Sequence, residues 1–476
     1  MAPDEVSMSI FAAVEAHTPQ FSHCSDAIWD EPELAFGEKT AADRLSRLLA
    51  AHGFAVTRGI AGMPTAFLAE WASAADAPHT VAFLGEYDAL PGLAQTADLS
   101  AQVAAWPGTP GHGCGHHLLG AASALAAVAL AETLNREGRP GRVRFYGCPA
   151  EEAGSGKVFL VRSGAFDDVD AAFTWHPHIV NEVDAETSLA FVEARFRFTG
   201  RAAHAAATPH LGRSALDAVE LMSVGVNYLR EHMPPDARVH SAITDTGGNA
   251  PNVVQATAEV VWLIRSPASA DCEDVFARVC DIARGAGLMT GTTVAHAITD
   301  AGQNILLSRA LMQAMERHLL AAGAPAPTPE DLAFAAELRG KAISEADIAG
   351  SLGGRPQALR AAPYHTAVLP LPADDRLAFV STDVGDVSWV VPTVQCHTAC
   401  YAIGTLFHTW QMVAQGKRAQ AHAGLALAAK AMAATAAECL ADPDLIARAK
   451  AELAERRGGR AYRSLLPPET GPALPA

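Results

Sequence analysis

The stretch VRFYGCPAEEAGSGKVFLVRSGAFDDVDAAFTWHP, residues 143–177, decides the fold. It contains two short apolar segments, 143–148 and 171–175, that have the length and composition of buried strands. Upstream, the apolar residues 79–84 predict another strand, and the apolar spacing of residues 118–134 predicts a helix. Strands that alternate with helices predict an α/β fold with a mainly parallel sheet flanked by helices on both faces. In such sheets the functional side chains lie on loops beyond the strand ends.

The middle of the chain, residues 188–302, has a different pattern. Its elements follow the order β-α-β-β-α-β, which is typical of a ferredoxin-like α+β domain, with strands at 189–198, 239–244, 256–264 and 292–297 and helices at 214–230 and 272–284. We therefore expect a main domain in two parts, residues 1–187 and 303–476, with residues 188–302 inserted between them. Residues 325–375 are rich in Pro and Gly and only weakly periodic, which predicts an irregular elaboration.

The composition excludes several classes of protein. A chain of 476 residues suits two domains, and its formal net charge of −17 argues against binding to nucleic acid or to anionic membranes. The longest nearly apolar stretch, 118–131, is too short to span a bilayer, and residues 1–16 lack the pattern of a signal peptide. Eight cysteines at irregular spacing do not make a disulfide framework, so we expect a reducing cytoplasm.

Cys114 and His116 stand two residues apart in GHGCGHH, residues 111–117, directly before the predicted helix. A thiolate and an imidazole can bind one or two metal ions, and glycine lets the backbone bend so that both side chains point inward. Taken alone, such a motif is more often a glycine-rich turn with incidental histidines.

Glu151 and Glu152 follow the predicted strand 143–148, within PAEEAGSG at residues 149–156. Adjacent carboxylates repel each other unless a cation or a shared proton relieves them. One of the pair could ligate a metal while the other serves as general base on a metal-bound water. An isolated Glu-Glu pair is more often a solvated acidic turn.

Two more histidines complete the set. His176 follows a predicted strand in WHPH, residues 175–178, and His408 precedes the C-terminal helices in GTLFHTW, residues 404–410. Alone, each has an ordinary structural explanation, but all the clusters fall at predicted strand-to-loop junctions. One Cys, one Glu and three His, with a spare Glu, fit two divalent transition-metal ions bridged by water better than an all-oxygen magnesium site.

Three stretches resemble a known family: GHGCGHHLLG at 111–120, the residues 149–177 and HAAATPHLGRSALDAV at 204–219. With them, most of the chain resembles the metal-dependent aminoacylase and carboxypeptidase superfamily. Within it, the chain is most similar to the branch that includes the B subunit of aminobenzoyl-glutamate hydrolase, the hippurate hydrolases and the auxin-conjugate hydrolases. The resemblance implies a phosphorylase/hydrolase-like catalytic domain with a dinuclear metal site, and an inserted lid or dimerisation domain.

The resemblance also assigns roles in the catalytic domain. Glu151 would be the general base, and the metal ligands would be Cys114, His116, Glu152, His176 and His408. The stretch GEYDALPG, residues 85–92, matches the strand-end Asp motif of the family, so Asp88 would orient a ligand and tune Glu151.

In the inserted domain, His204, Asn252 and Arg265 lie where relatives contact substrate. The insert of such relatives mediates dimerisation, and its histidine reaches the active site of the partner. A tetrahedral intermediate needs donors where oxyanion charge develops, and a substrate carboxylate suits an arginine fork. We therefore expect a homodimer in which His204 acts across the interface while Asn252 and Arg265 hold a carboxylate. Arg265 could instead be a surface charge, and His210 and Arg213 are weaker candidates.

Two positions depart from the family pattern. The branch usually has Asp after its second histidine, where this chain has His117; the aminobenzoyl-glutamate group departs there as well. The acidic motif before the final histidine is matched only loosely by DVGDVS, residues 383–388, and no role follows for Asp386.

The function implied by the resemblance is that of a metal-dependent amidohydrolase. Its substrate would be an N-acyl amino acid, best represented by p-aminobenzoyl-glutamate, attacked by water that bridges two zinc or manganese ions in each subunit. Two alternatives stay open: a dipeptidase or aminoacylase with another acyl preference, and a non-catalytic partner subunit on the same scaffold. A hetero-oligomer with a related subunit is a further possibility, whereas neither nucleic acid nor membrane is expected as a partner.

Overall fold

The computed structural model describes residues 5–74, 77–106 and 108–475. Its larger sheet has seven strands in the order β1-β2-β4-β3-β5-β13-β6. The pairs β4/β3, β3/β5 and β5/β13 are parallel, whereas β1, β2 and β6 pair antiparallel at the edges. The predicted parallel arrangement is therefore confirmed for the centre of the sheet. The strands are β1 (Ala55–Arg58), β2 (Phe67–Ala72), β3 (Thr80–Glu86), β4 (Arg142–Cys148), β5 (Ala171–His178), β6 (Glu182–Val183) and β13 (Thr393–Ala399).

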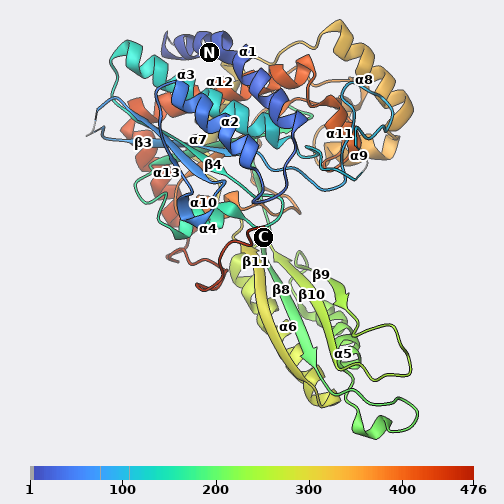
Figure 1. Cartoon of the computed structure of the whole chain (residues 1–476). Coiled ribbons are helices and arrows are strands. Elements are labelled where there is room, and N and C mark those ends of the chain that lie inside the picture. Colours follow the sequence, from blue (N-terminus) through green and yellow to red (C-terminus); the bar gives the residue numbers. More distant parts are fainter. Residues whose placement is uncertain (1–4, 75–76, 107, 476) are drawn as a thin grey trace.

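Helices cover both faces of this sheet (Figure 1). On one face α3 (His116–Glu137), α7 (Arg309–Ala322) and α12 (Ala419–Ala441) pack on the strands, with α1 (Glu5–Asp30) over α3 and α12. The other face is covered by α4 (Gly156–Arg162) and α10 (Val384–Ser388). The remaining helices of this part are α2 (Lys39–Ala51), α11 (Trp410–Gln415) and α13 (Pro443–Arg456).

Helices α3 and α12 are long and apolar enough to cross a membrane by length and composition. In α3 an apolar surface runs around the whole helix, which is the pattern of a helix buried on all sides. Within the apolar windows, 94% of the residues of α3 and 72% of those of α12 are buried inside the protein. Both helices are therefore accounted for as core helices of the larger sheet.

The second sheet has four antiparallel strands in the order β11-β8-β10-β9, with helices α5 and α6 on one face. Its elements are β8 (Ala190–Thr199), α5 (Ala215–Leu229), β9 (Arg238–Asp245), β10 (Thr257–Ser266), α6 (Ser269–Thr290) and β11 (Thr293–Gly302). This is the predicted ferredoxin-like order, and the unit projects from the rest of the molecule as a separate lobe (Figure 1). We propose the limits 188 and 302 for this inserted domain, which agree with the ends of its sheet.

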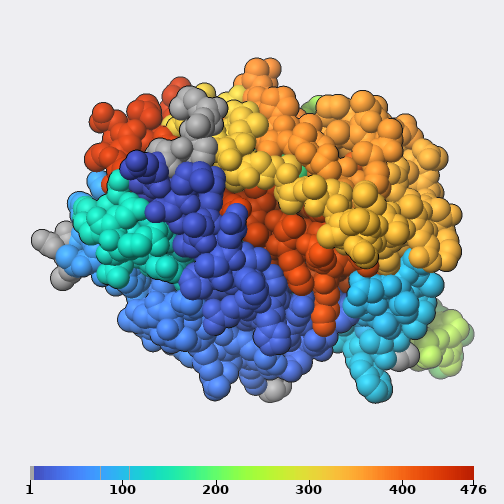
Figure 2. Space-filling model, turned by 90° about the horizontal axis from the view of Figure 1, so that it is seen from above, coloured from blue at the N-terminus to red at the C-terminus, as the bar shows by residue number. Residues whose placement is uncertain are grey.

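The prediction of an irregular elaboration at 325–375 is wrong for much of the segment. It forms α8 (Pro329–Ala342) and α9 (Glu345–Leu352), followed by a loop that leads to β12 (Arg376–Leu377), which pairs with β7 (Glu186–Thr187). Each helix starts with a capping box in which the side chains of Thr328 and Asp331, or of Ser344 and Asp347, exchange hydrogen bonds with the backbone. Figure 2 shows this orange segment at one side of the face viewed from above.

Candidate metal centre and active site

The donor atoms of all five predicted ligands meet beside the carboxyl ends of β3, β4 and β5. They form two groups whose ligand atoms lie within 4.8 Å of one another: Cys114 with His116 and His176, and Cys114 with Glu152 and His408. Cys114 belongs to both groups. The arrangement is that of two neighbouring cation sites with the thiolate between them.

The loops that carry these donors are held together by backbone contacts. The backbone N–H of His408 donates to the carbonyl of Gly113 at 2.8 Å. A Cβ on Gly113 would lie 2.5 Å from the end of the Leu93 side chain, so a larger residue here would displace that side chain. His408 itself has a φ of 60°, a left-handed conformation that costs energy in a non-glycine residue and recurs at functional sites.

His176 lies within β5 rather than after it, because the pairing of β5 with β13 continues as far as His178. The Nδ1 atom of His176 lies 3.0 Å from the carbonyl of Pro177, to which it donates, and Nε2 faces the Cys114 sulfur at 3.4 Å. Burial lowers the pKa of His176 to about 3, so that the imidazole is neutral and its Nε2 lone pair is free for a metal.

Asp88 orients two of the predicted ligands at once. Its Oδ1 accepts from Nδ1 of His116 at 2.8 Å, and its Oδ2 accepts from the backbone N–H of Glu152 at 2.9 Å. Although burial alone would raise the pKa of Asp88, the neighbouring His116 keeps it below its ordinary value. A carboxylate behind a histidine fixes the tautomer and turns the second ring nitrogen toward a metal.

Two buried polar atoms without a hydrogen-bond partner indicate that this cluster suits a metal ion. His116 Nε2 and Glu152 Oε1 are buried and make no hydrogen bond within the described residues, and both belong to the groups above. Buried polar atoms without partners are costly, and a cation would satisfy both. One sulfur, three imidazole nitrogens and one carboxylate form a set of donors that suits divalent transition-metal ions. The residues present therefore fit a metal centre.

Glu151 stands next to this cluster, with Oε2 at 4.0 Å from Nε2 of His116. Burial, and after it the charge of Glu86, raises the pKa of Glu151 well above its ordinary value. A carboxyl group with a raised pKa can take up a proton and give it back near neutral pH, which is what a general base and acid must do.

Sequence reasoning missed a buried ion cluster beneath this site. Lys157 Nζ lies 2.5 Å from Glu86 and 2.6 Å from Asp383, and the three side chains are almost completely buried. Although burial alone would lower the pKa of Lys157, Asp383 and Glu86 hold it well above its ordinary value. Glu86 is part of the motif GEYDALPG, residues 85–92, and Asp383 is the first residue of the acidic motif DVGDVS, residues 383–388. The acidic residues of these two motifs were the available signal for the ion cluster.

Asp386, for which no role was predicted, lies where the two lobes join. Its Oδ2 accepts from the backbone N–H of Gln303, directly after β11, and its Oδ1 accepts from the Tyr462 hydroxyl at 2.7 Å. The carboxyl group thus connects α10, the end of the inserted lobe and the C-terminal tail.

The structure does not bring the three predicted residues of the insert to the cluster within one chain. His204 and Asn252 are exposed at the far end of the lobe, where Ala205 N–H donates to the carbonyl of Asn252. Arg265 lies near the other end of β10, opposite Phe191, and is half-buried. None of the three is among the described residues that line the cavity beside the cluster.

His210 and Arg213, the weaker candidates of the insert, take part in contacts that stabilise a loop. Arg213 donates to the carbonyls of His210 and Gly212, so that its guanidinium braces the loop between β8 and α5. That loop starts at the far end of the lobe, away from the cluster.

A cavity of about 310 Å³ opens beside the cluster and extends along the sheet toward β6. Besides Glu86 and the predicted residues, four polar side chains at its other end were missed by sequence reasoning: His178, Asp184, Gln395 and His397. The His178 and His397 rings stack with centroids 4.6 Å apart. His178 lies on β5, Gln395 and His397 lie on β13, and Asp184 directly follows β6. Only the unpredicted strand β13 and its pairing bring them together.

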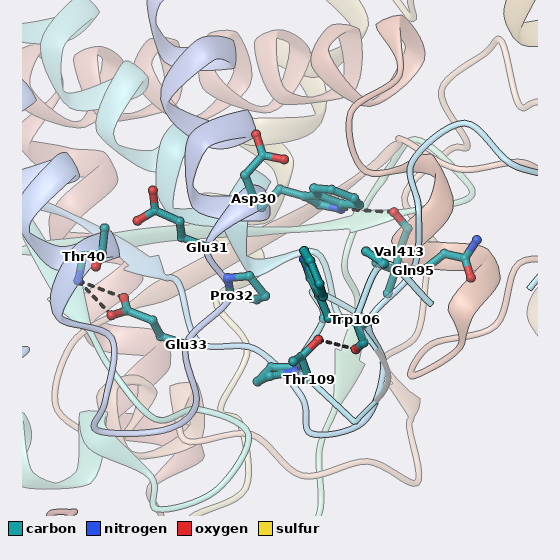
Figure 3. A pocket seen from close by; sticks show the side chains of 14 residues that line it. Asp30, Glu31, Pro32, Glu33, Thr40, Gln95, Trp106, Thr109 and Val413 are labelled. Atoms are coloured by element: carbon teal, nitrogen blue, oxygen red, sulfur yellow. Dashed lines mark hydrogen bonds between the residues drawn. The ribbon is translucent and has the colours of Figure 1, made fainter. Parts of the chain in front are cut away.

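Figure 3 shows a second hollow, of about 360 Å³, lined by Trp29, Trp106 and three carboxylates among others. Its carboxylates already have partners: Asp30 pairs with Lys417, Glu31 pairs with Arg44, and Glu33 accepts from Thr40 N–H at the start of α2. The cluster beside the smaller cavity is therefore the better candidate for chemistry.

Comparison with known proteins agrees with this assignment. The profile of peptidase family M20/M25/M40 matches residues 82–345. The B subunit of p-aminobenzoyl-glutamate hydrolase from Escherichia coli (strain K12) is 44% identical over 98% of this chain and 99% of its own length. Xaa-Arg dipeptidase from Mus musculus is 37% identical over 57% of this chain and 60% of its own.

Solved structures show the same fold at low sequence identity. A putative aminohydrolase from methicillin-resistant Staphylococcus aureus superposes with a TM-score of 0.63 at 17% identity, covering 91% of this chain and 100% of that one. A dinuclear metal-binding peptidase from Bacillus subtilis has a TM-score of 0.57 at 16% identity, covering 90% and 99%.

The matches confirm the resemblance drawn from the sequence and the expectation of a hydrolase that acts on amide bonds. The family profile covers more than half of the residues, and the relative from E. coli is similar from end to end. The chain therefore belongs to peptidase family M20/M25/M40.

Proposed function

We propose that this protein hydrolyses the amide bond of an N-acyl amino acid, with p-aminobenzoyl-glutamate as its best candidate substrate. The observation that carries the proposal is the meeting of five metal donors and the free carboxyl group of Glu151 beside one cavity. The end-to-end similarity to the B subunit of p-aminobenzoyl-glutamate hydrolase supports this substrate.

Two divalent ions, zinc or manganese, would be held by the two donor groups that share Cys114. When bound, they supply the acidification of a water molecule and the polarisation of the substrate carbonyl. A thiolate ligand favours the softer of the two metals, zinc.

The chain's own residues perform the proton transfers. Glu151 takes the proton of the attacking water on its carboxylate and passes it to the nitrogen of the leaving amine. Asp88 keeps His116 and Glu152 in their orientations during this cycle. Arg265 of one chain, with Asn252 and His204 of the partner subunit, would hold the substrate carboxylate and the carbonyl oxygen.

We propose a homodimer as the working assembly, because one chain leaves His204 and Asn252 exposed and far from the cluster. A hetero-oligomer is also supported by similarity to the A subunit of p-aminobenzoyl-glutamate hydrolase from E. coli, 30% identical over 38% of this chain. We propose the cytoplasm as its location, which agrees with eight free cysteine thiols.

A dipeptidase is the second candidate function, favoured by the similarity to Xaa-Arg dipeptidase. A non-catalytic role is disfavoured, since a chain without chemistry has no need of five converging donors and a buried base. A panel of aroyl-glutamates, aliphatic N-acyl amino acids and dipeptides, offered to the purified protein, separates these functions.

The substitution Glu151→Gln tests the proposed mechanism. We expect the variant to keep its metal content. Glu151 is in neither of the two groups that contain Cys114, and in the third group of possible ligands, Glu86 with His116 and Glu151, an amide oxygen would take the place of one carboxylate oxygen. Turnover of p-aminobenzoyl-glutamate should fall by roughly 10²–10⁴-fold or more, since the proton acceptor is lost. Elemental analysis and a hydrolysis assay measure the two effects, and near-normal turnover in this variant would eliminate the assigned role.

A further inference from the structure

The cavity beside the metal donors has a second polar end, formed on β13 and β6. Gln395 and His397 are two residues apart on β13, and His176 and His178 are two apart on β5, so each pair points to one face of the sheet. Asp184 follows β6, and its backbone N–H donates to the carbonyl of Gln395. A row of side chains therefore continues from the metal donors across β13 to the sheet edge.

Carboxylates line this end of the cavity. Asp184 and Glu186 are part of its wall, whereas the described lining residues include neither Arg nor Lys. The arginines Arg355 and Arg376 lie behind the wall, 3.5 Å and 3.4 Å from Glu186. Although burial alone would lower the pKa of the neighbouring His397, Asp184 and Glu182 raise it above its ordinary value. Among the described lining residues at this end, however, a substrate carboxylate would meet two acids and neither a guanidinium nor an ammonium group. The half of the substrate that reaches this end is therefore the acyl half, which carries no carboxylate.

Asp184 is held firmly and still has acceptor capacity. Its Oδ2 accepts from Nε2 of Gln395 at 2.9 Å, and its Oδ1 accepts from the backbone N–H of Glu186 at 3.0 Å. Each carboxylate oxygen has two lone pairs. Because Gln395 gives its amide N–H to Asp184, its Oε1 is left as an acceptor and receives no hydrogen bond within the described residues. His397 Nε2 lies 3.6 Å from Asp184 Oδ2, which is beyond hydrogen-bond distance, so the pair still presents unused acceptors to the cavity.

The wall between the two ends is apolar and partly aromatic. The Phe407 ring lies 5.1 Å from that of His176 and 5.4 Å from that of His178, and Val380 and Ile305 also line the cavity. A cavity of about 310 Å³ with such a wall suits one small flat group.

We propose that Asp184 and Gln395 are specificity-determining residues that select an acyl group ending in an amino group, an arylamine in preference to an alkylammonium. This inference rests on the proposed function, because it places the acyl half of that substrate. An acyl group without the amino donor would leave buried acceptors unpaired, which costs affinity for the transition state.

Two substrate pairs that differ only in the amino group test the proposal on the metal-loaded protein. They are 4-aminobenzoyl-glutamate with benzoyl-glutamate, and alanyl-glutamate with propionyl-glutamate. We expect kcat/KM to favour the 4-aminobenzoyl substrate by about tenfold or more, and Asp184→Asn to reduce that ratio below about threefold. If Asp184→Asn does not fold, Gln395→Ala carries the same test.

Asp170→Asn is the matched control, because Asp170 precedes β5 at the end away from the cavity and should leave the ratio unchanged. A ratio that Asp184→Asn and Gln395→Ala both leave intact overturns the proposal, and so does a wild-type ratio near one. A larger ratio for the alanyl pair overturns the choice of an arylamine.

A binding measurement separates failure of this inference from failure of the proposed function. If no acyl-glutamate is hydrolysed, the proposed function fails, but calorimetry with 4-aminobenzoate and benzoate still probes the pocket. The wild-type protein should bind the amino compound at least about threefold more tightly, and Asp184→Asn should bind the two alike. Equal affinities in the wild-type protein would refute the specificity site.

Discussion

At the scale of single residues, Cys114 differs from the other donors because it belongs to both ligand groups. We expect Cys114→Ala to lose most of both metal ions, whereas His176→Ala and His408→Ala should each lose about one of the two. Elemental analysis after gel filtration measures the metal content.

His178→Ala is the control for these variants, because His178 lies two residues from His176 on the same strand but in neither ligand group. It should keep the full metal content. Loss of both ions from His176→Ala, with only one lost from Cys114→Ala, would contradict a shared thiolate.

Asp386 makes the unfolding free energy of the protein depend on pH, and it is not one of the metal donors. Burial raises the pKa of Asp386 from an ordinary value of 3.8 to about 7. Between these values the folded protein binds a proton that the unfolded chain releases, so this carboxyl group makes stability fall as the pH rises from about 4 to about 7.

Asp386→Asn removes this contribution to the pH dependence of the unfolding free energy, because the amide does not titrate. The unfolding free energy of the variant minus that of the wild-type protein should therefore increase by roughly 1–4 kcal/mol from pH 4 to pH 8. The lost hydrogen-bond acceptor adds to this difference an amount that does not depend on pH. Urea titrations of both proteins at several pH values give the comparison. A difference between them that is independent of pH would contradict the raised pKa.

The five donors and Glu151 were singled out because several clusters of metal-binding residue types fall at predicted strand-to-loop junctions, and the family resemblance then assigned their roles and that of Asp88. Glu86, Lys157 and Asp383 could not be predicted in this way. In a sequence, an isolated Glu, Lys or Asp is typical of a solvated surface, and only the fold shows that the three neutralise one another in the interior.

At the scale of elements, the strands and helices of the inserted lobe, and β3, β4 and β5 of the larger sheet with the helix α3, follow from apolar periodicity. Helices α8 and α9 were missed, because a Pro- and Gly-rich composition obscured two start signals, Thr328 to Asp331 and Ser344 to Asp347. Strand β13 was missed because Gln395, His397 and Thr398 interrupt its apolar pattern. Both omissions matter for the site, since β13 supplies the second polar end of the cavity.

The segment that contains α8 and α9 anchors that end through Arg355. The Nε atom of Arg355 donates to Glu182 at 2.8 Å, and both side chains are buried. Arg355→Met removes the nearest partner of a buried carboxylate, which then keeps only His397 at 3.3 Å and Arg376 at 3.6 Å. We expect a loss of roughly 1–3 kcal/mol in unfolding free energy, measured by urea denaturation.

Two further variants make this prediction specific. Glu182→Gln combined with Arg355→Met should recover part of the loss, because it removes a buried charge that has lost its nearest partner. Arg360→Met, in the same segment, breaks only an exposed pair with Glu345 and should change stability by less than about 1 kcal/mol. An equal loss for Arg355→Met and Arg360→Met would argue against the buried pair.

At the scale of the whole molecule, the projecting lobe carries His204 and Asn252 away from the cluster of metal donors (Figure 1). His204 and Asn252 follow and precede the ends of β8 and β10 that lie far from the cluster, whereas Arg265 lies near the other end of β10. A strand of ten residues spans roughly 30 Å, so one chain cannot bring Asn252 and Arg265 to one carboxylate by small adjustments. The sequence resemblance anticipated the separation only by assigning His204 to a partner.

Mixing two inactive variants tests whether the site is shared between subunits. In a symmetric dimer formed from Glu151→Gln and His204→Ala chains, one of the two sites combines an intact Glu151 with the partner subunit's His204 and should be active. Random assortment of co-expressed chains makes half of the dimers mixed, so activity should return to about a quarter of the wild-type level. Each variant alone should stay nearly inactive with its metal content intact. If His204 served its own chain, every site in the mixture would lack either Glu151 or His204, and no activity would return.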